Sequence, residues 1–255
     1  MTVSAHPTLS FGSLLKLLFS ASDKPYITGR SFDFKNGRTA LYNGLISICE
    51  KGRNQVLLPD YNCGHEIEAV LRSGNKPVFY PVDKKCQINL DSLTALISSK
   101  TLAILTTHFN GFPQPVHELK KLCTDHDLYL IEDCAHVFQS RAFTRYLGQF
   151  GDMAIFSPRK FLPIYDGGIL VINNPDIGFK GRVCSADIAE NARSMAYPIK
   201  KMLKAQLEQI MSRRQTDTAE ELQGTEAENT AIYDFHEKNY TQGITGFSRW
   251  ACNRV

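Results

Sequence analysis

The chain has 255 residues, of which 43% are hydrophobic and 22% charged, the composition of a globular protein with material for one large domain. Its net charge of +3, from 29 basic and 26 acidic residues, is too balanced to indicate a nucleic-acid partner. The sequence has no run long and apolar enough to cross a bilayer, and its seven cysteines, without a CxxC pair, favour free thiols in a reducing compartment. We therefore expect a cytoplasmic protein with neither a membrane nor a nucleic-acid partner.

Residues 1–34 are expected to form an N-terminal helical segment. The run LSFGSLLKLLFSA within it resembles a signal sequence. It lacks a preceding basic region and has Lys16 inside its apolar stretch, which favours a short amphipathic helix.

Helix-like and strand-like stretches alternate through residues 35–180, the expected core domain. The strand-like runs are rich in Val, Ile, Leu, Phe and Tyr, and the helix-like runs have helical spacing of apolar residues. This alternation predicts an α/β fold, a three-layer α/β/α sandwich around a mainly parallel sheet. The last two strand-like runs leave no room for a helix between them, so one of them is expected to be antiparallel. The predicted helices are 38–52, 64–74, 90–100 and 115–127; the predicted strands are 55–59, 76–82, 102–109, 128–133, 152–157 and 167–173.

The pattern changes after the last predicted strand. Residues 181–215 are expected to form a helical extension, because PIKKMLKAQLEQIMSRR has an apolar stripe at helical spacing. Residues 216–255 are expected to form a polar linker and a short closing segment, since QTDTAEELQGTEAENT has almost no large apolar residues.

Polar side chains stand where the predicted strands end. Asp133 ends LYLIED and is followed by His136, while Ser157 ends DMAIFS and precedes Lys160 by three residues. His108 ends LAILTTH and is expected to hold the loop at the end of its strand. Because ligands of parallel sheets bind beyond the carboxyl ends of the strands, we expect a site at this edge.

An anion site is expected at the same edge. Asn36–Gly37 precedes the first predicted helix of the core, which places a glycine turn and free backbone N–H groups at a helix N-terminus. An acid, a lysine, a hydroxyl and an anion cradle together match pyridoxal phosphate, which needs a lysine for its Schiff base and a carboxylate facing its pyridine nitrogen. The carboxylate keeps that nitrogen protonated, because an adjacent negative charge favours the charged form.

Five segments in order resemble the DegT/DnrJ/StrS family of pyridoxal-phosphate-dependent sugar aminotransferases, over about residues 35–175. They correspond to the family's phosphate loop, its next strand–helix–strand unit, its His-x-x-Gly segment, its Glu-Asp-x-Ala-Gln/His segment and its Ser-to-Lys-to-Gly-Gly segment. In this chain the segments read NGRTAL, LLPDYNCGHEIEAVLRSGNKPVFYPVD, LTTHFNGFPQPVHELKKLC, LYLIEDCAHVFQS and GDMAIFSPRKFLPIYDGGILVIN.

The resemblance implies roles for two catalytic residues and for a phosphate site. Lys160 would form the aldimine with the cofactor and move the proton during catalysis, and Asp133 would pair with the pyridine nitrogen. Ser157 would bind the phosphate together with the backbone at Arg38 and Thr39.

The resemblance also implies contacts with the cofactor ring. His136 stands where the family commonly has a glutamine, and its imidazole would contact the ring hydroxyl. Cys63 falls near the ring-stacking position, for which Tyr61 and His65 are alternatives.

By resemblance, the reaction is transfer of an amino group, usually from glutamate, to a nucleotide-linked keto sugar in amino sugar and polysaccharide biosynthesis, by a homodimer. The chain departs from the family in the short spacing between Ser157 and Lys160, stiffened by Pro158. It also stops near the start of the family's C-terminal domain. One alternative is therefore a truncated, non-catalytic domain that binds the cofactor or a partner.

Other chemistries are less well supported by the residues. A pyridoxal-phosphate-dependent sugar dehydratase often has histidine in place of the lysine, so Lys160 counts against it. A Cys–His hydrolase built on Cys63 and His65, or on Cys134 and His136, lacks an evident orienting acid and oxyanion loop. A zinc site at Cys134 and His136 lacks spaced ligand pairs, so we expect no metal.

Overall fold

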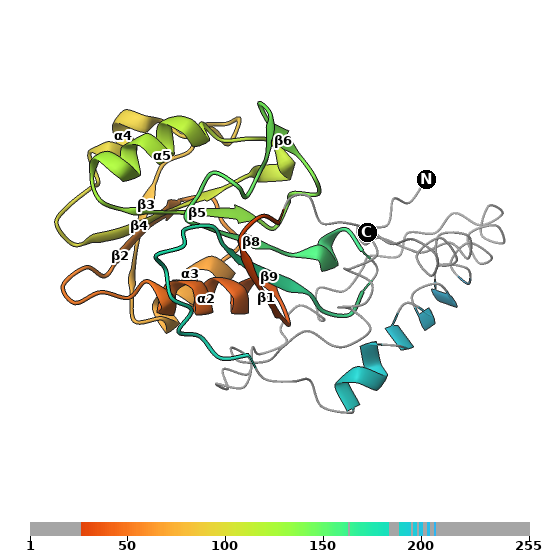
Figure 1. Cartoon of the computed structure of the whole chain (residues 1–255). Coiled ribbons are helices and arrows are strands. Elements are labelled where there is room, and N and C mark those ends of the chain that lie inside the picture. The colour runs from red at the N-terminus through yellow and green to blue at the C-terminus, as the bar shows by residue number, and fades with distance from the viewer. Residues whose placement is uncertain are drawn as a thin grey trace, which may run out of the picture.

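The alternating pattern produces one seven-stranded sheet (Figure 1). The structure is a computed structural model that describes residues 27–207, other than 163, 184–188, 195, 198, 201–202 and 205–206. Strands β3, β2, β4, β5 and β8 are parallel to one another, whereas β9 is antiparallel to β8 and β1 is antiparallel to β9. The expected antiparallel strand is therefore β9. Across the sheet the order is β1 (Arg30–Phe34), β9 (Gly168–Ile172), β8 (Met153–Phe156), β5 (Tyr129–Cys134), β4 (Thr101–Thr107), β2 (Gln55–Pro59) and β3 (Lys76–Tyr80).

Helices cover both faces of the sheet, which confirms the three-layer α/β/α sandwich (Figure 1). Helices α2 (Gly37–Ser47) and α3 (His65–Arg72) lie on one face, and α4 (Leu90–Thr94) and α5 (Val116–Asp125) lie on the other. Helix α4 is much shorter than the 90–100 stretch predicted for it. None of the helices in the described part of the chain is long and apolar enough to span a membrane.

The buried strands divide their side chains between the two faces, as the two-residue repeat of a strand requires. In β5, Ile131 packs in the cluster that includes Leu41 and Leu45 of α2. Its neighbour Leu130 packs in the cluster that includes Leu119 of α5. The alternation places Asp133 on the side of α2 and α3, and Glu132 on the side of α5.

Two elements lie outside the expected pattern. The boundary at residue 34 is corrected, because Arg30–Phe34 is a strand of the sheet, paired with β9 over its whole length, and not part of a helical segment. Its sequence, RSFDF, is short and partly charged, so its place depends on backbone pairing at the sheet edge rather than on a strong apolar pattern. The hairpin of β6 (Arg141–Ala142) and β7 (Arg145–Tyr146) is also new.

Several of the sequence predictions concern the two ends of the chain. The amphipathic helix before residue 27 and the polar linker and closing segment of 216–255 lie outside the described residues. Residues 189–194 are helical, in line with the predicted extension, which is otherwise described only in part.

Gly168 brings β9 against the start of α2. A Cβ atom at this residue would lie 2.1 Å from the carbonyl carbon and oxygen of Asn36 and 2.7 Å from the nitrogen of Gly37. Because these are backbone atoms, they cannot move aside without displacing the turn at the helix N-terminus. The second glycine of the pair in the sequence, Gly168, is therefore required by a close backbone approach.

We expect Gly168→Ala to lower the free energy of unfolding by about 1–3 kcal/mol through overpacking. Chemical denaturation measures this directly. Gly178→Ala is the matched control, because a Cβ atom there meets nothing within 4 Å. Equal stability of the two variants would contradict the close approach.

Candidate active site

The carboxyl ends of the central strands and the N-termini of α2 and α3 form one edge of the domain. Asp133 lies near the end of β5, paired with Thr107 of β4, and Ser157 follows β8 directly. A 3-10 helix, Pro158–Lys160, continues from Ser157, and the backbone N–H of Lys160 donates to the carbonyl of Ser157 at 3.0 Å. The short spacing noted in the sequence is therefore closed by a single tight turn.

Helix α2 begins at Gly37, the position at which the sequence predicts an anion site. A Cβ atom at Gly37 would lie 3.6 Å from Cβ of Ser157 and 3.9 Å from its Oγ, so the serine borders this helix end. Asn36 caps the helix, and its Oδ1 accepts from the backbone N–H of Thr39 at 3.0 Å and from the Thr39 hydroxyl at 3.1 Å. The Thr39 amide is thus already engaged. Arg38 forms an ion pair with Glu68 of α3.

Asp133 is a buried acid, only 1% exposed. The backbone N–H of Ala135 donates to its Oδ1 at 2.8 Å. Burial is the main cause that raises the pKa of Asp133 to about 7, followed by the negative charge of Glu66, which also hydrogen-bonds to it. The positive charge of Lys160 acts in the opposite direction. An acid and a lysine predicted from the sequence to share one site are therefore close enough to interact.

Lys160 also interacts with His136. Burial lowers the pKa of His136, and the charge of Lys160 lowers it further, so the imidazole is neutral at neutral pH. Its Nδ1 atom is buried and has no hydrogen-bond partner in the described part of the chain. A buried polar atom without a partner carries a free-energy cost that a bound ligand can remove.

Cys63 lies just before α3, and the charge of Lys160 acts on it too. Its Sγ is 3.5 Å from Nδ1 of His65 and donates to the carboxylate of Glu66 at 3.0 and 3.3 Å. Burial and Glu66 raise the pKa of the thiol to about 11 despite the charge of Lys160. The thiol therefore stays protonated, which disfavours the Cys–His hydrolase, since the thiolate is the nucleophile.

The two alternatives for ring stacking differ in their surroundings. Tyr61 is 63% exposed and its ring centroid is 5.5 Å from that of Phe109, at an angle of 39°. His65 is half-buried, and burial and the charge of Arg38 lower its pKa. Cys63 remains our prediction for this position, because its thiol lies within range of the Lys160 charge.

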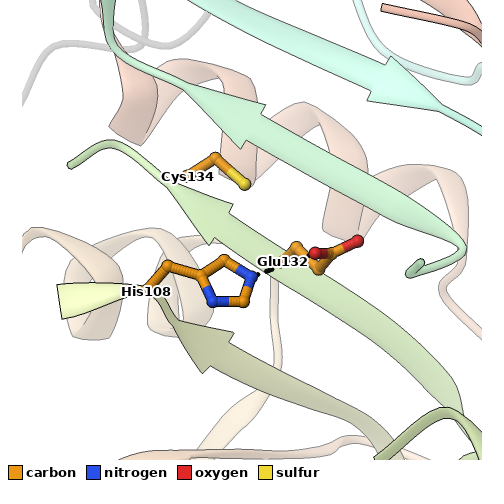
Figure 2. Close-up of side chains that lie close together, drawn as sticks. All are labelled: His108, Glu132 and Cys134. Atoms are coloured by element: carbon orange, nitrogen blue, oxygen red, sulfur yellow. Dashed lines mark hydrogen bonds and ion pairs between the residues drawn. The ribbon is translucent and has the colours of Figure 1, made fainter. Parts of the chain in front are cut away.

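His108, Glu132 and Cys134 form a buried cluster on the other face of the sheet (Figure 2). Nδ1 of His108 accepts from the backbone N–H of Gln114 at 3.2 Å, so Nε2 has the proton and donates to Glu132 at 3.0 Å. His108 therefore holds the loop after β4, as the sequence analysis expected.

Glu132 accepts three further hydrogen bonds. The backbone N–H of Gly148 donates to its Oε2 at 2.9 Å, and those of Phe150 and Gly151 donate to Oε1 at 2.7 and 2.6 Å. Four donors fill the lone pairs of the carboxylate. The side-chain atoms of His108, Glu132 and Cys134 that could bind a metal ion lie within 4.8 Å of one another. Those of His108 and Glu132 are already engaged in hydrogen bonds. This cluster therefore serves hydrogen bonding and not metal binding.

Sequence reasoning missed two acids, Glu132 and Glu66. Glu132 was visible as the first acid of the Glu-Asp pair in LYLIED, and strand alternation alone assigns it to the opposite face from Asp133. Glu66 gave no signal, because an acid in the first turn of a helix is common for reasons of helix polarity alone.

The raised pKa of Asp133 predicts a stability effect that depends on pH. Between about pH 4, where an aspartate in an unfolded chain titrates, and about pH 7, where Asp133 titrates, the folded protein holds a proton that the unfolded chain has lost. The free energy of unfolding therefore falls as the pH rises through this window, by up to about 1.4 kcal/mol per pH unit.

Asp133→Asn is expected to remove this fall, measured by chemical denaturation over the pH series. His65 and His136 contribute with the opposite sign, because their pKa values are lowered by burial. The difference between the two pH profiles isolates Asp133. Parallel profiles for both proteins would contradict its raised pKa.

Comparisons with known proteins identify the family to which this chain belongs. The sequence profile of the DegT/DnrJ/EryC1/StrS aminotransferase family matches residues 29–233. The chain is 30% identical to a GDP-perosamine synthase of Escherichia coli O157:H7 over an alignment of 142 residues. The alignment covers 54% of this chain and 39% of that protein. The chain is 31% identical to the dTDP-4-dehydro-2,3,6-trideoxy-D-glucose 4-aminotransferase of Saccharopolyspora spinosa over 153 residues. This alignment covers 58% of this chain and 40% of that protein.

The fold is shared with solved aminotransferases. The structure of PseC from Helicobacter pylori, an aminotransferase of pseudoaminic acid biosynthesis, aligns with a TM-score of 0.58 at 22% identity, over 68% of this chain and 52% of that one. The chain spans about two fifths of the length of the two curated relatives named above. The profile match covers most of the chain, so it belongs to the DegT/DnrJ/EryC1/StrS aminotransferase family, whose members depend on pyridoxal phosphate.

Proposed function

We propose that this chain carries the pyridoxal-phosphate site of an aminotransferase that transfers an amino group from glutamate to a nucleotide-linked keto sugar. The observation that carries the proposal is the position of Lys160, whose charge acts on Asp133, His136 and Cys63 at one edge of the sheet. Cys63 precedes α3, Lys160 follows β8, and Asp133 and His136 lie at the end of β5, so the fold brings together three separate parts of the sequence.

The residues at this edge fit the cofactor. The Nδ1 atom of His136 is buried and has no partner in the described part of the chain, and Ser157 lies beside the start of α2 at Gly37. A helix N-terminus with an adjacent hydroxyl suits a phosphate group. Gly37 and Arg38 supply the first backbone amides of α2, whereas the Thr39 amide would first have to leave Asn36.

When bound, pyridoxal phosphate supplies an aldehyde that condenses with amines and a ring that stabilises negative charge on the reacting carbon. Lys160 would be the amine that bonds to that aldehyde and that moves the proton at the reacting carbon. Asp133 would favour a positive charge on the ring nitrogen, because an adjacent carboxylate favours the protonated form. His136 would contact the ring hydroxyl, and Cys63 would lie against the ring.

The names of the relatives support the substrate class. A GDP-perosamine synthase, a dTDP-keto-sugar 4-aminotransferase and a UDP-N-acetyl-3-dehydro-alpha-D-glucosamine 3-aminotransferase from Acidithiobacillus ferrooxidans are all similar to this chain. They differ in the nucleotide and in the position that is aminated. We therefore propose a nucleotide-linked keto sugar as acceptor, without a choice among them.

We further propose that the working form is a cytoplasmic homodimer. Four exposed aromatic side chains follow the carboxyl ends of strands or lie in the hairpin beside them, an arrangement typical of a surface that a second copy covers. They are Tyr61, Phe112, Phe138 and Phe143.

The test is reductive trapping followed by a half-reaction. Borohydride treatment with pyridoxal phosphate should leave a pyridoxyl adduct on the peptide that contains Lys160, and glutamate should convert the bound cofactor to pyridoxamine phosphate. An adduct without conversion would support the non-catalytic alternative. No selective adduct in a folded sample would overturn the proposal.

A further inference from the structure

Thr107, the last residue of β4, has a buried hydroxyl that lacks a partner. The residue is only 6% exposed, and its Oγ1 atom forms no hydrogen bond within the described part of the chain. A buried polar atom of this kind is rare in folded proteins, because it carries a free-energy cost that a hydrogen bond would remove. The hydroxyl therefore calls for a partner that the protein alone does not supply.

The register of the sheet places this hydroxyl next to Asp133. Thr107 and Asp133 are paired residues of the parallel strands β4 and β5, so their side chains project from the same face. The packing agrees, because Leu105 of β4 and Ile131 of β5, two residues earlier in each strand, belong to the same core cluster. Neighbouring strands lie about 4.8 Å apart, which brings a hydroxyl and a carboxyl on paired residues within reach of a hydrogen bond.

The preference of threonine for strands does not explain a hydroxyl at this position. A β-branched side chain suits a strand through its shape, and valine has that shape without a polar atom to bury. Thr101, at the other end of β4, is also buried, but its hydroxyl accepts from the backbone N–H of Ser98 at 2.9 Å. The hydroxyl of Thr107 has no such use within the fold.

Asp133 needs hydrogen-bond donors if it is to serve the cofactor in its ionised form. A carboxylate has about four acceptor sites, and burial is costly when these are left empty. Glu132, the preceding residue, accepts from His108 and from three backbone N–H groups. Among the described residues, the carboxyl of Asp133 accepts one backbone N–H, that of Ala135 at 2.8 Å. The hydroxyl of Thr107 is a further donor on the same face.

We propose that Thr107 is a positioning residue of the cofactor site, whose hydroxyl donates to the carboxylate of Asp133 when the cofactor is bound. This inference rests on the proposed function. Thr107 lies on the β4 side of Asp133, whereas Ser157 and Lys160 follow β8 on the other side, because the strands are ordered β8, β5, β4. The hydroxyl therefore orients Asp133 from the side opposite to the other predicted residues.

The first experiment is chemical denaturation of the cofactor-free protein. Thr107→Val keeps the shape of the side chain and removes a hydroxyl that has no partner in this form, so its midpoint of unfolding should equal or exceed that of wild type. Thr101→Val is the matched control and should lower the midpoint, because it leaves the Ser98 amide without its acceptor. A lower midpoint for Thr107→Val would mean that its hydroxyl is already used within the fold, and would overturn the proposal.

The second experiment measures the dissociation constant of pyridoxal phosphate by absorbance titration. Thr107→Val should bind the cofactor about ten- to a hundredfold more weakly, the range for loss of a hydrogen bond to a charged group. Thr107→Ser retains the hydroxyl and should restore most of the affinity. Thr106→Val alters the neighbouring threonine, which projects toward α5 and interacts with Tyr80, and should leave the affinity unchanged.

A double-mutant cycle tests whether the effect passes through Asp133. A hydrogen bond to a neutral amide is about half as strong as one to a carboxylate. Thr107→Val should therefore weaken cofactor binding less in an Asp133→Asn background than in wild type. An equal effect in both backgrounds would mean that the hydroxyl does not act through the carboxylate, and would overturn this role.

The outcomes separate the two proposals. Equal affinity of wild type and Thr107→Val for the cofactor would overturn the role of Thr107 and leave the proposed function in place. Absence of cofactor binding by wild type would overturn the proposed function, and the role of Thr107 with it. Higher stability of Thr107→Val together with weaker binding is the result that a merely structural threonine would not give.

Discussion

Replacement of Lys160 by alanine is expected to abolish amino transfer. The rate of pyridoxamine phosphate formation from glutamate should fall by about 10⁴-fold or more, as rates do in other enzymes when the catalytic nucleophile is removed. The reason is that the chain loses both the amine that bonds to the cofactor and the base that moves the proton. Stopped-flow absorbance of the half-reaction measures this loss, and the borohydride adduct should disappear from the Lys160 peptide.

Lys160→Arg and Lys121→Ala are the controls. Arginine keeps the positive charge beside Asp133 but is not an amine that condenses with an aldehyde, so it should be as inactive as alanine. Lys121 is an exposed lysine on α5, paired with Asp125, and its loss should change neither rate nor adduct. Retention of a selective adduct in Lys160→Ala would assign the cofactor to another lysine.

Replacement of Glu132 by alanine is expected to have the largest effect on stability, a loss of about 3–5 kcal/mol in the free energy of unfolding. The substitution leaves His108 and three backbone N–H groups buried without an acceptor. Thermal and chemical denaturation of the cofactor-free protein measure the loss.

Glu132→Gln separates charge from shape. The amide keeps one acceptor oxygen but presents its NH₂ group to backbone donors, so it should cost somewhat less than alanine. Asp125→Ala removes an exposed acid of α5 and should change stability by less than about 0.5 kcal/mol. If Glu132→Ala matched Asp125→Ala, the hydrogen-bond cluster would contribute little to folding.

The sequence allowed the sheet and its edge to be predicted because buried strands have dense apolar runs and the acids and lysine follow them directly. Asp133, Ser157 and Lys160 were predicted as site residues in this way, and that role stays a prediction. Glu66 was not predicted, because its effect on Asp133 depends on how closely α3 approaches β5, a tertiary distance that local pattern does not encode. The strand at residues 30–34 was missed for a related reason, since an edge strand is held by backbone pairing and needs no apolar pattern of its own.

The Asn36–Gly37 turn illustrates what the sequence can and cannot specify. The glycine predicted a helix N-terminus open to an anion, and Ser157 is beside it. The cap formed by Asn36 on the Thr39 amide was not foreseen, although asparagine is a preferred N-cap residue. Which amides remain open to a phosphate depends on this local competition.

The neighbouring carboxyls of β5 differ in role: Glu132 accepts hydrogen bonds that hold the fold, and Asp133 belongs to the proposed cofactor site. A slip of one residue in the pairing of β5 with β4 and β8 would exchange them, because each step along a strand reverses the face. Insertion or deletion of a single residue between Tyr129 and Glu132 would then put the wrong acid on each side. This strand end should therefore accept conservative substitutions more readily than any change in its length.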